Sequence, residues 1–259
     1  MSKQGVVFLM YHELGLPGRE PCQREPGYTR YVVPQTDFLD QMKRFAREGW
    51  RGASVGQAIQ SFSSKFVCLT FDDGCETDLL CAAPVLKELG FGATFYITLG
   101  FLGRPGYLSE MQVRELLALG FELGCHSQTH PYLTDVDERR LEDETKGAKH
   151  RLERITGATV EHFSCPGGRW DHRVLEAVKK AGFRTMATSR TGINDAETDV
   201  FELTRVAVLS GMSVEQVTRM SRGDGLLQTR VKEGARGLIR DLLGNSTYDS
   251  LRSMVLRQK

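Results

Sequence analysis

The stretch Phe66-Val-Cys-Leu-Thr70-Phe71-Asp72-Asp73-Gly74 decides how this sequence is interpreted. Its apolar start predicts a buried strand over 66–70, which runs directly into two adjacent carboxylates. Like charges side by side raise each other's pKa, so the pair is costly unless a cation lies nearby. Neighbouring residues in extended backbone also point in opposite directions, so Asp72 and Asp73 can do different work. The alternative is an ordinary Asp-Gly turn with both carboxylates in water.

Apolar runs of the same kind recur along the chain, with amphipathic stretches between them. The expected strands are Val6–Met10, Phe66–Thr70, Ala93–Ile97, Glu122–Cys125, Val160–Ser164, Thr185–Thr188 and Arg205–Leu209. A long charged helix is expected within 134–157, with Leu141, Ala148, Leu152 and Ile155 as its buried stripe. Strands that alternate with helices predict an α/β fold with a parallel sheet. In such folds, functional residues lie in the loops that follow the strands.

Composition excludes several classes of protein. The chain has 259 residues, and 34 basic against 33 acidic side chains give a net charge of +1, so no basic excess points to nucleic acid. The longest uncharged run, 89–103, is too short and too polar to span a bilayer. The first residues predict a strand and not a signal peptide, so we expect a cytoplasmic location. None of the six cysteines forms a Cys-x-x-Cys pair, and reduced thiols are expected.

The last part of the chain differs in charge. Residues 226–259 carry seven Lys or Arg against three Asp or Glu, a net +4, which leaves −3 for residues 1–225. We therefore expect one α/β domain over 1–225 and a basic amphipathic helical tail over 226–259. The tail either packs on the domain or a partner, or it touches a membrane surface.

Two further motifs follow predicted strands. In His126-Ser-Gln-Thr-His130 the imidazoles are four residues apart and can share one face of a helical turn. Zinc favours two imidazoles with a carboxylate and a position open to water, whereas a lone His is more often structural. In Pro166-Gly167-Gly168, the glycines allow a tight backbone that exposes an N–H to a ligand.

Side chains near these motifs have less specific patterns. Arg169 either orients a carboxylate or lies on the surface. Trp170 either stacks on a sugar or belongs to the core. Tyr11-His12 ends the first predicted strand, and by itself the lone imidazole is weak evidence of a site.

Taken in order, the Asp72-Asp73, His126–His130 and Pro166–Gly168 motifs resemble the polysaccharide deacetylase (NodB-homology) family, carbohydrate esterase family 4, over roughly residues 5–220. The resemblance implies a distorted (β/α) barrel of about seven parallel strands. It also implies a metal-dependent hydrolase that removes N-acetyl groups from the amino sugars of a glycan. The roles that it implies are Asp72 as catalytic base, the Gly167 N–H as oxyanion donor, and Asp73, His126 and His130 as ligands of Zn²⁺ or another divalent metal.

The chain departs from the family pattern at two places. Ser164 stands where the family has an Arg that braces the base, and Arg169 is one candidate to replace it. The family's late Leu-x-His motif, which supplies the general acid, is missing. His12 is the best substitute, because the chain is similar here to the biofilm poly-N-acetylglucosamine deacetylases, whose acid is the His of an N-terminal Tyr-His at a strand end. We expect Tyr11, Arg169 and Trp170 to contact the substrate.

Two other functions remain open at this point. One is an amidohydrolase or deformylase that acts on a smaller or lipid-linked substrate, because a fold and a metal triad do not select the substrate. The other is a catalytically impaired homologue that binds glycan without cleaving it.

Overall fold

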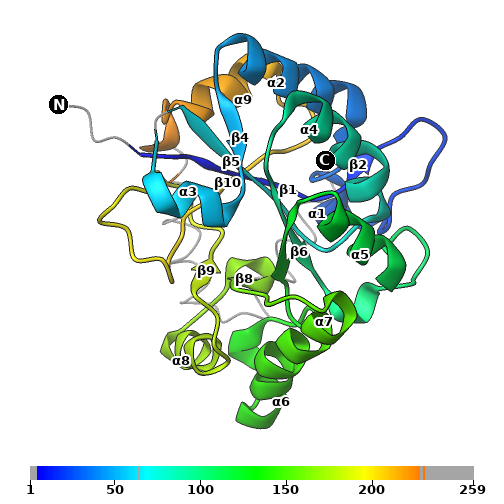
Figure 1. Ribbon diagram of the computed structural model, residues 1–259, viewed down its shortest axis with the longest axis vertical. Coiled ribbons are helices and arrows are strands. Elements are labelled where there is room, and N and C mark those ends of the chain that lie inside the picture. Colours follow the sequence, from blue (N-terminus) through cyan, green and yellow to red (C-terminus); the bar gives the residue numbers. More distant parts are fainter. Residues whose placement is uncertain (1–4, 64, 228–229, 231–259) are drawn as a thin grey trace.

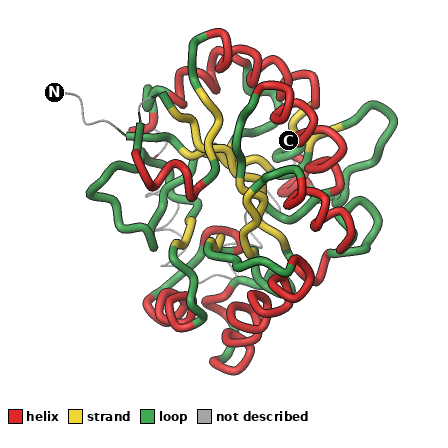
Figure 2. Tube along the Cα trace, viewed as in Figure 1, coloured by secondary structure: helices red, strands yellow, loops and turns green. Residues whose placement is uncertain are grey.

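Parallel strands form the middle of the molecule, and helices surround them (Figure 1; Figure 2). The structure, a computed structural model, describes residues 5–63, 65–227 and 230. The main sheet consists of β1 (Phe8–Tyr11), β4 (Arg51–Ala53), β5 (Phe66–Phe71), β6 (Thr94–Ile97), β7 (Glu122–Cys125), β8 (His162–Ser164), β9 (Thr185–Ala187) and β10 (Val206–Ala207). A separate short pair, β2 (Leu14–Gly15) and β3 (Val33–Pro34), brackets the loop after β1.

The main sheet curls into a barrel. Seven strands follow one another in the order β10-β1-β5-β6-β7-β8-β9, all pairs are parallel, and β4 pairs with β5 outside this path. Beyond β9, a parallel bridge joins Ala187 to Leu203, in the run that leads into β10. The distorted barrel of about seven parallel strands is therefore confirmed. Because the strands are parallel, all their carboxyl ends open on one side.

The seven expected strands are all present, with ends that shift by at most two residues. β4 is absent from the sequence prediction, because its three residues, Arg-Gly-Ala, include no β-branched or aromatic side chain. Its conformation comes from pairing with β5 and not from local propensity.

Helices cover the outer face of the sheet (Figure 1). They are α1 (Pro26–Thr29), α2 (Gln35–Arg47), α3 (Val55–Ser61), α4 (Ala83–Leu89), α5 (Glu110–Ala118), α6 (Glu138–Glu142), α7 (Ala148–Thr156), α8 (His172–Lys180) and α9 (Val214–Ser221). Short turns of other helix types are η1 (Asp78–Ala82), η2 (Leu99–Phe101), η3 (Leu133–Asp135), η4 (Asp143–Gly147) and η5 (Pro166–Gly168). The long helix expected within 134–157 is the run α6–η4–α7, in which η4 is a wider, π-helical turn.

Side chains alternate between two apolar layers along the strands. In β1, Leu9 belongs to the large core between the sheet and the helices, whereas Phe8 belongs to a smaller cluster. In β5, Leu69 and Cys68 alternate in the same way. Since successive side chains of a strand point to opposite faces, the smaller cluster, which includes Tyr96, fills the interior of the barrel.

Polar side chains tie together the first residues of four strands. The Glu122 carboxylate, at the start of β7, accepts hydrogen bonds from the Thr94 hydroxyl and from the Gly56 backbone N–H. Its Oε2 lies 3.4 Å from Nε2 of His162, whose Nδ1 is 2.9 Å from the Thr185 hydroxyl. Burial raises the pKa of Glu122, but the His162 and Thr94 contacts outweigh it, so the net shift of this pKa is downward.

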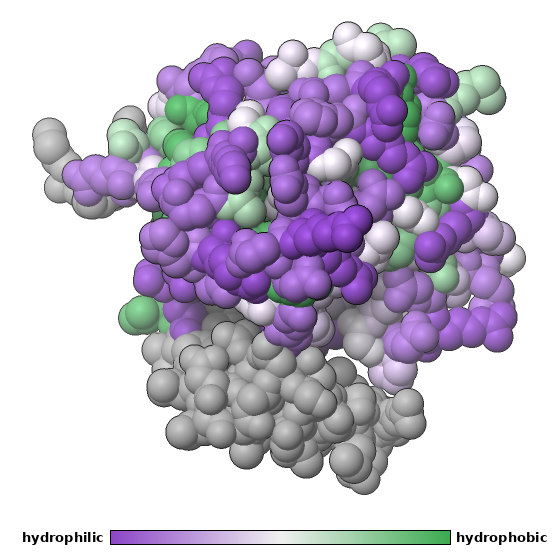
Figure 3. Space-filling model, turned by 90° about the horizontal axis from the view of Figure 1, so that it is seen from below, coloured by the Kyte–Doolittle hydropathy of each residue, from purple (hydrophilic) through white to green (hydrophobic). Residues whose placement is uncertain are grey.

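Most of the expected tail lies outside the described residues, so its helix and its membrane contact stay predictions. Among the described residues, no helix is both long and apolar enough to cross a membrane. The face drawn in Figure 3 is mostly hydrophilic where the structure describes it.

We expect Glu122→Ala to lower the free energy of unfolding by roughly 2–3 kcal/mol, because it leaves buried donors without an acceptor. Since the folded state depresses this pKa, the contribution is complete above about pH 4.3 and disappears as the pH falls through the folded-state pKa. Urea denaturation of the wild type and of Glu122→Ala from pH 7 to pH 3 measures this contribution. Glu161→Ala, at a more exposed position, is the control, and a difference that does not shrink in acid would contradict the assignment.

Candidate active site

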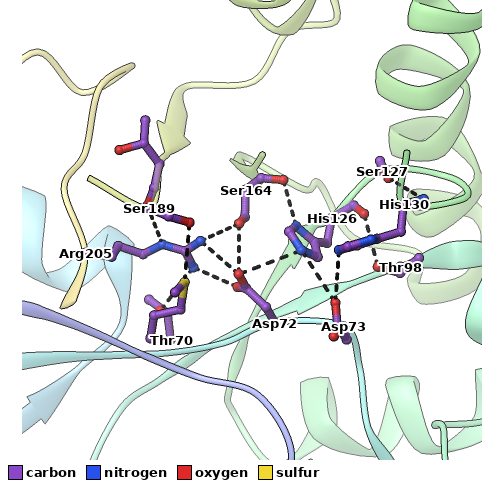
Figure 4. Close-up of polar contacts among 12 residues, drawn as sticks. Thr70, Asp72, Asp73, Thr98, His126, Ser127, His130, Ser164, Ser189 and Arg205 are labelled. Atoms are coloured by element: carbon purple, nitrogen blue, oxygen red, sulfur yellow. Dashed lines mark hydrogen bonds and ion pairs between the residues drawn. The ribbon is translucent and has the colours of Figure 1, made fainter. Parts of the chain in front are cut away.

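The carboxyl end of β5 carries Asp72 and Asp73, and the two side chains turn to different partners (Figure 4). Asp73 has φ = 80°, a left-handed conformation that is uncommon outside glycine, and Gly74 follows with φ = 77°. The two aspartates are only 2% and 4% exposed. This burial rules out the alternative of a solvated Asp-Gly turn.

Asp73 and two imidazoles converge on one point. Asp73 Oδ1 lies 3.6 Å from Nε2 of His126 and 3.4 Å from Nε2 of His130. Neither contact forms a hydrogen bond, and Oδ1 is buried without a hydrogen-bond partner among the described residues. Zinc bonds of about 2.0–2.1 Å at tetrahedral angles would place such atoms about 3.3 Å apart. The donor set and its spacing therefore fit a divalent cation, and the metal ligands expected from the sequence come together.

A backbone contact fixes the orientation of His126. Its Nδ1 lies 2.8 Å from the carbonyl oxygen of Ser164, at the end of β8. With Nδ1 as the donor, Nε2 is the atom that faces Asp73 and Asp72. Burial lowers the pKa of His126 to about 4, so the ring is neutral at neutral pH, the form in which imidazole binds a metal.

Glu144 holds the loop between the two histidines. Its buried carboxylate, in η4, accepts hydrogen bonds from the backbone N–H groups of Gln128 (2.9 Å) and Thr129 (2.7 Å) and from the Thr129 hydroxyl. Ser127 and His130 have φ values of 67° and 63°, so the loop is strained at both. The hydrogen bonds to Glu144 keep this strained loop in the conformation that presents both rings.

Arg205 braces Asp72. Its guanidinium is fully buried and donates to Asp72 Oδ1 (2.7 Å) and Oδ2 (2.8 Å), and also to the Ser164 hydroxyl (2.8 Å). Burial, the largest single cause, would raise the pKa of Asp72, but the charge and hydrogen bonds of Arg205, together with the charges of His126 and His12, outweigh it and hold this pKa well below its usual range. The carboxylate is therefore ionised at neutral pH.

Arg169 is the candidate from the sequence for the missing family Arg, but the structure places Arg205 against Asp72. Arg205, just before β10, contacts Asp72 instead, and Ser164 adds a weaker hydrogen bond of 3.3 Å. Arg169 packs its guanidinium 3.7 Å from the ring centre of Tyr132. One signal in the sequence points to Arg205: a lone charge at the head of an otherwise apolar strand pattern, which a buried strand tolerates only when the charge is paired.

The side chains of Tyr11 and His12, at the end of β1, have different surroundings. Burial, the largest cause, lowers the pKa of His12. The charges of Asp73 and Asp72 act in the opposite direction, and those of Arg205 and His130 add to the lowering. Tyr11 is fully buried and donates its hydroxyl to Gln41 (2.7 Å) in the core beneath α2. Its position supports packing rather than the expected contact with substrate.

The loop after β8 brings a glycine against an aromatic ring. Gly167 has φ = 61°, and a Cβ there would lie 2.5 Å from the ring of Tyr132, so only glycine fits. Trp170 is half-buried, with the guanidinium of Arg190 4.9 Å from its ring centre. Tyr132, which the sequence analysis does not single out, is 37% exposed.

Comparison with known proteins agrees with this geometry. Residues 60–186 match the family model described as polysaccharide deacetylase. The chain is 27% identical over 187 residues to a putative polysaccharide deacetylase of Bacillus subtilis, covering 70% of this chain and 67% of that protein. It is 30% identical over 138 residues to a chitooligosaccharide deacetylase of Azorhizobium caulinodans, covering 52% of this chain and 64% of that one. The matched segments thus span about two thirds of these relatives.

Solved structures show the same fold. A polysaccharide deacetylase from Bacillus cereus has a TM-score of 0.74 at 27% identity, covering 85% of this chain and 69% of its own. IcaB from Ammonifex degensii has a TM-score of 0.69 at 24% identity, covering 85% of this chain and 97% of its own.

We expect Arg205→Met to lower the free energy of unfolding by about 3–5 kcal/mol, because Asp72 stays buried without a counter-charge. The double variant Arg205→Met with Asp72→Asn should lose clearly less, since it buries no unpaired charge. Urea denaturation of Arg205→Met, of Asp72→Asn and of the double variant gives the coupling energy between the two residues. Arg190→Met, whose side chain is 63% exposed, is the control. Strictly additive losses would contradict the pairing.

We expect Glu144→Gln to weaken zinc binding by about 10–100-fold, because an amide cannot accept from all the donors of the loop. Competition with a chromophoric chelator measures this affinity. Glu142→Gln, on the exposed side of the same helical run, should bind zinc as the wild type does. Equal affinities for the two variants would show that Glu144 does not position the histidines.

Proposed function

This chain belongs to the polysaccharide deacetylase family, and from that premise we propose that it hydrolyses N-acetyl groups on amino sugars of a poly- or oligosaccharide. One observation carries the proposal. A candidate metal triad and a separately braced carboxylate lie side by side at the end of β5, with Asp72 Oδ2 3.7 Å from Nε2 of His126. Amide hydrolysis needs both an electrophilic centre for the carbonyl and a base for water.

Asp73, His126 and His130 would hold the metal, for which we propose Zn²⁺. A bound divalent cation polarises a carbonyl and lowers the pKa of its water towards about 7. The protein contributes the fixed positions of these side chains. His126 is oriented by Ser164, and His130 by the loop that Glu144 holds.

Asp72 acts as the general base in this proposal. Arg205 keeps the carboxylate ionised and fixes its plane through two hydrogen bonds, so it is ready to take a proton from the attacking water. The bidentate contact also restrains its rotation, so the base keeps its direction towards His126.

His12 protonates the departing amine in this proposal. It follows β1, whose carboxyl end opens on the same side of the sheet as those of β5 and β7, and its Nδ1 is buried without a hydrogen-bond partner among the described residues. An amine leaves poorly unless it is protonated, so an imidazole beside the leaving group has a clear use. The Gly167 N–H serves as oxyanion donor, and Arg169, Trp170 and the exposed ring of Tyr132 form the sugar-facing wall.

Acetate release from a fully acetylated chito-oligosaccharide, with zinc supplied, tests the proposal. His12→Gln should lower kcat by about 10²–10⁴-fold while the zinc content is unchanged. His126→Ala should lose the zinc held by Asp73, His126 and His130, and with it the activity. His150→Gln, an exposed position on α7, is the control.

The outcomes separate the alternatives. If the protein binds glycan but releases no acetate from any acetylated amino sugar, the proposed enzyme activity is wrong and the protein is a glycan-binding homologue. Full activity of His12→Gln would remove the acid role from this residue and leave the metal and the base untouched.

A further inference from the structure

Three segments meet beside the candidate active site and bring a carboxylate and two thiols together. Glu13 follows His12 at the end of β1, and Cys75 follows the Asp72–Gly74 turn at the end of β5. Cys22 comes from the long loop between β2 and α1. Its backbone N–H donates to Glu13 (2.9 Å), and its thiol donates to the Gly106 carbonyl (3.1 Å).

The spacing of the three ligand atoms suits one ion. The two sulfur atoms are 3.8 Å apart, and each ligand atom of Glu13, Cys22 and Cys75 lies within 4.8 Å of the others. Two zinc–sulfur bonds of about 2.3 Å at a tetrahedral angle place their sulfurs about 3.8 Å apart. Glu13 and Cys75 are 2% and 0% exposed, whereas Cys22 is half-buried, so solvent reaches the cluster from one side.

The surroundings of the cluster favour a cation. The Glu13 carboxylate accepts from the Cys22 N–H and the Tyr28 hydroxyl (2.9 Å), and both of these donors are neutral. Asp78, one turn after Cys75, is fully buried, and neither of its carboxylate oxygens has a hydrogen-bond partner among the described residues.

We propose that Glu13, Cys22 and Cys75 form a second metal site, which takes a thiophilic divalent cation such as Zn²⁺. Two thiolates and one carboxylate are ligands that zinc accepts, and water completes the shell on the half-buried side. The Tyr28 hydroxyl contacts both Glu13 and Cys75 (3.3 Å) and would orient these ligands from outside. The site shares no ligand with Asp73, His126 and His130.

A metal at this site would tie the 16–25 loop to the turn that carries Asp72 and Asp73. The loop has no described strand or helix of its own before α1, so few backbone hydrogen bonds hold it. The site would therefore be structural, because it fixes the loop beside His12 instead of binding substrate.

Cobalt titration of the metal-free, reduced full chain tests the proposal, because thiolate ligands give a sulfur-to-cobalt charge-transfer absorption that His and Asp ligands do not. The wild type should bind two equivalents and develop this band. Cys22→Ser and Glu13→Gln should each bind one equivalent and lose the band, because the remaining site has no thiolate ligand. Cys81→Ser, a thiol in the neighbouring η1, is the control and should behave as the wild type does.

His126→Ala separates this proposal from the proposed function. It should bind one equivalent and keep the thiolate band, even if the protein has no deacetylase activity at all. Zinc should also protect Cys22 from alkylation, measured by mass spectrometry of its peptide. A wild type without the band, a band that survives Cys22→Ser, or a Cys22–Cys75 disulfide that forms in the presence of excess zinc would each overturn the second site.

Discussion

The ion pair between Arg205 and Asp72 is the interaction on which the rest of the site depends. One buried guanidinium contacts the Asp72 carboxylate after β5, the Ser164 hydroxyl of β8 and the Thr188 carbonyl after β9, so it links three strands from inside the barrel. An unpaired charge at this depth would cost several kcal/mol of folding free energy, so the Arg205 guanidinium is held firmly against the Asp72 carboxylate. The same contacts that close the interior therefore also set the direction and the charge of the proposed base.

Backbone strain concentrates at the candidate metal triad. Asp73, Ser127 and His130 are three of the four described residues other than glycine with positive φ, and two of them are proposed ligands. Such conformations persist only when their surroundings enforce them. The loop is enforced by Glu144, which meets two of its N–H groups, and by the Ser127 hydroxyl, which accepts from the His130 N–H (3.0 Å). The stability of the rest of the fold therefore compensates for the unfavourable backbone conformations at this site.

Local sequence pattern predicts much of this structure, because apolar runs mark the strands and the motifs lie at their ends. Arg205 was missed because its partner is 133 positions away, and no local pattern encodes that pairing. Glu144 was missed although it falls between Leu141 and Ala148 on the buried stripe of its helix, where a carboxylate should have indicated a buried acceptor. The sequence does not predict β4, because Arg-Gly-Ala is a strand only through its pairing with β5.

The position of β1 between β10 and β5 bears on how this active site arose. The resemblance places the family's general acid late in the chain, whereas His12 stands near its start. In space these two places are close, because β10 pairs directly with β1 and neighbouring strands lie about 4.8 Å apart. A proton donor carried by either of these neighbouring strands would therefore reach the same part of the site, even though the two strands lie at opposite ends of the sequence.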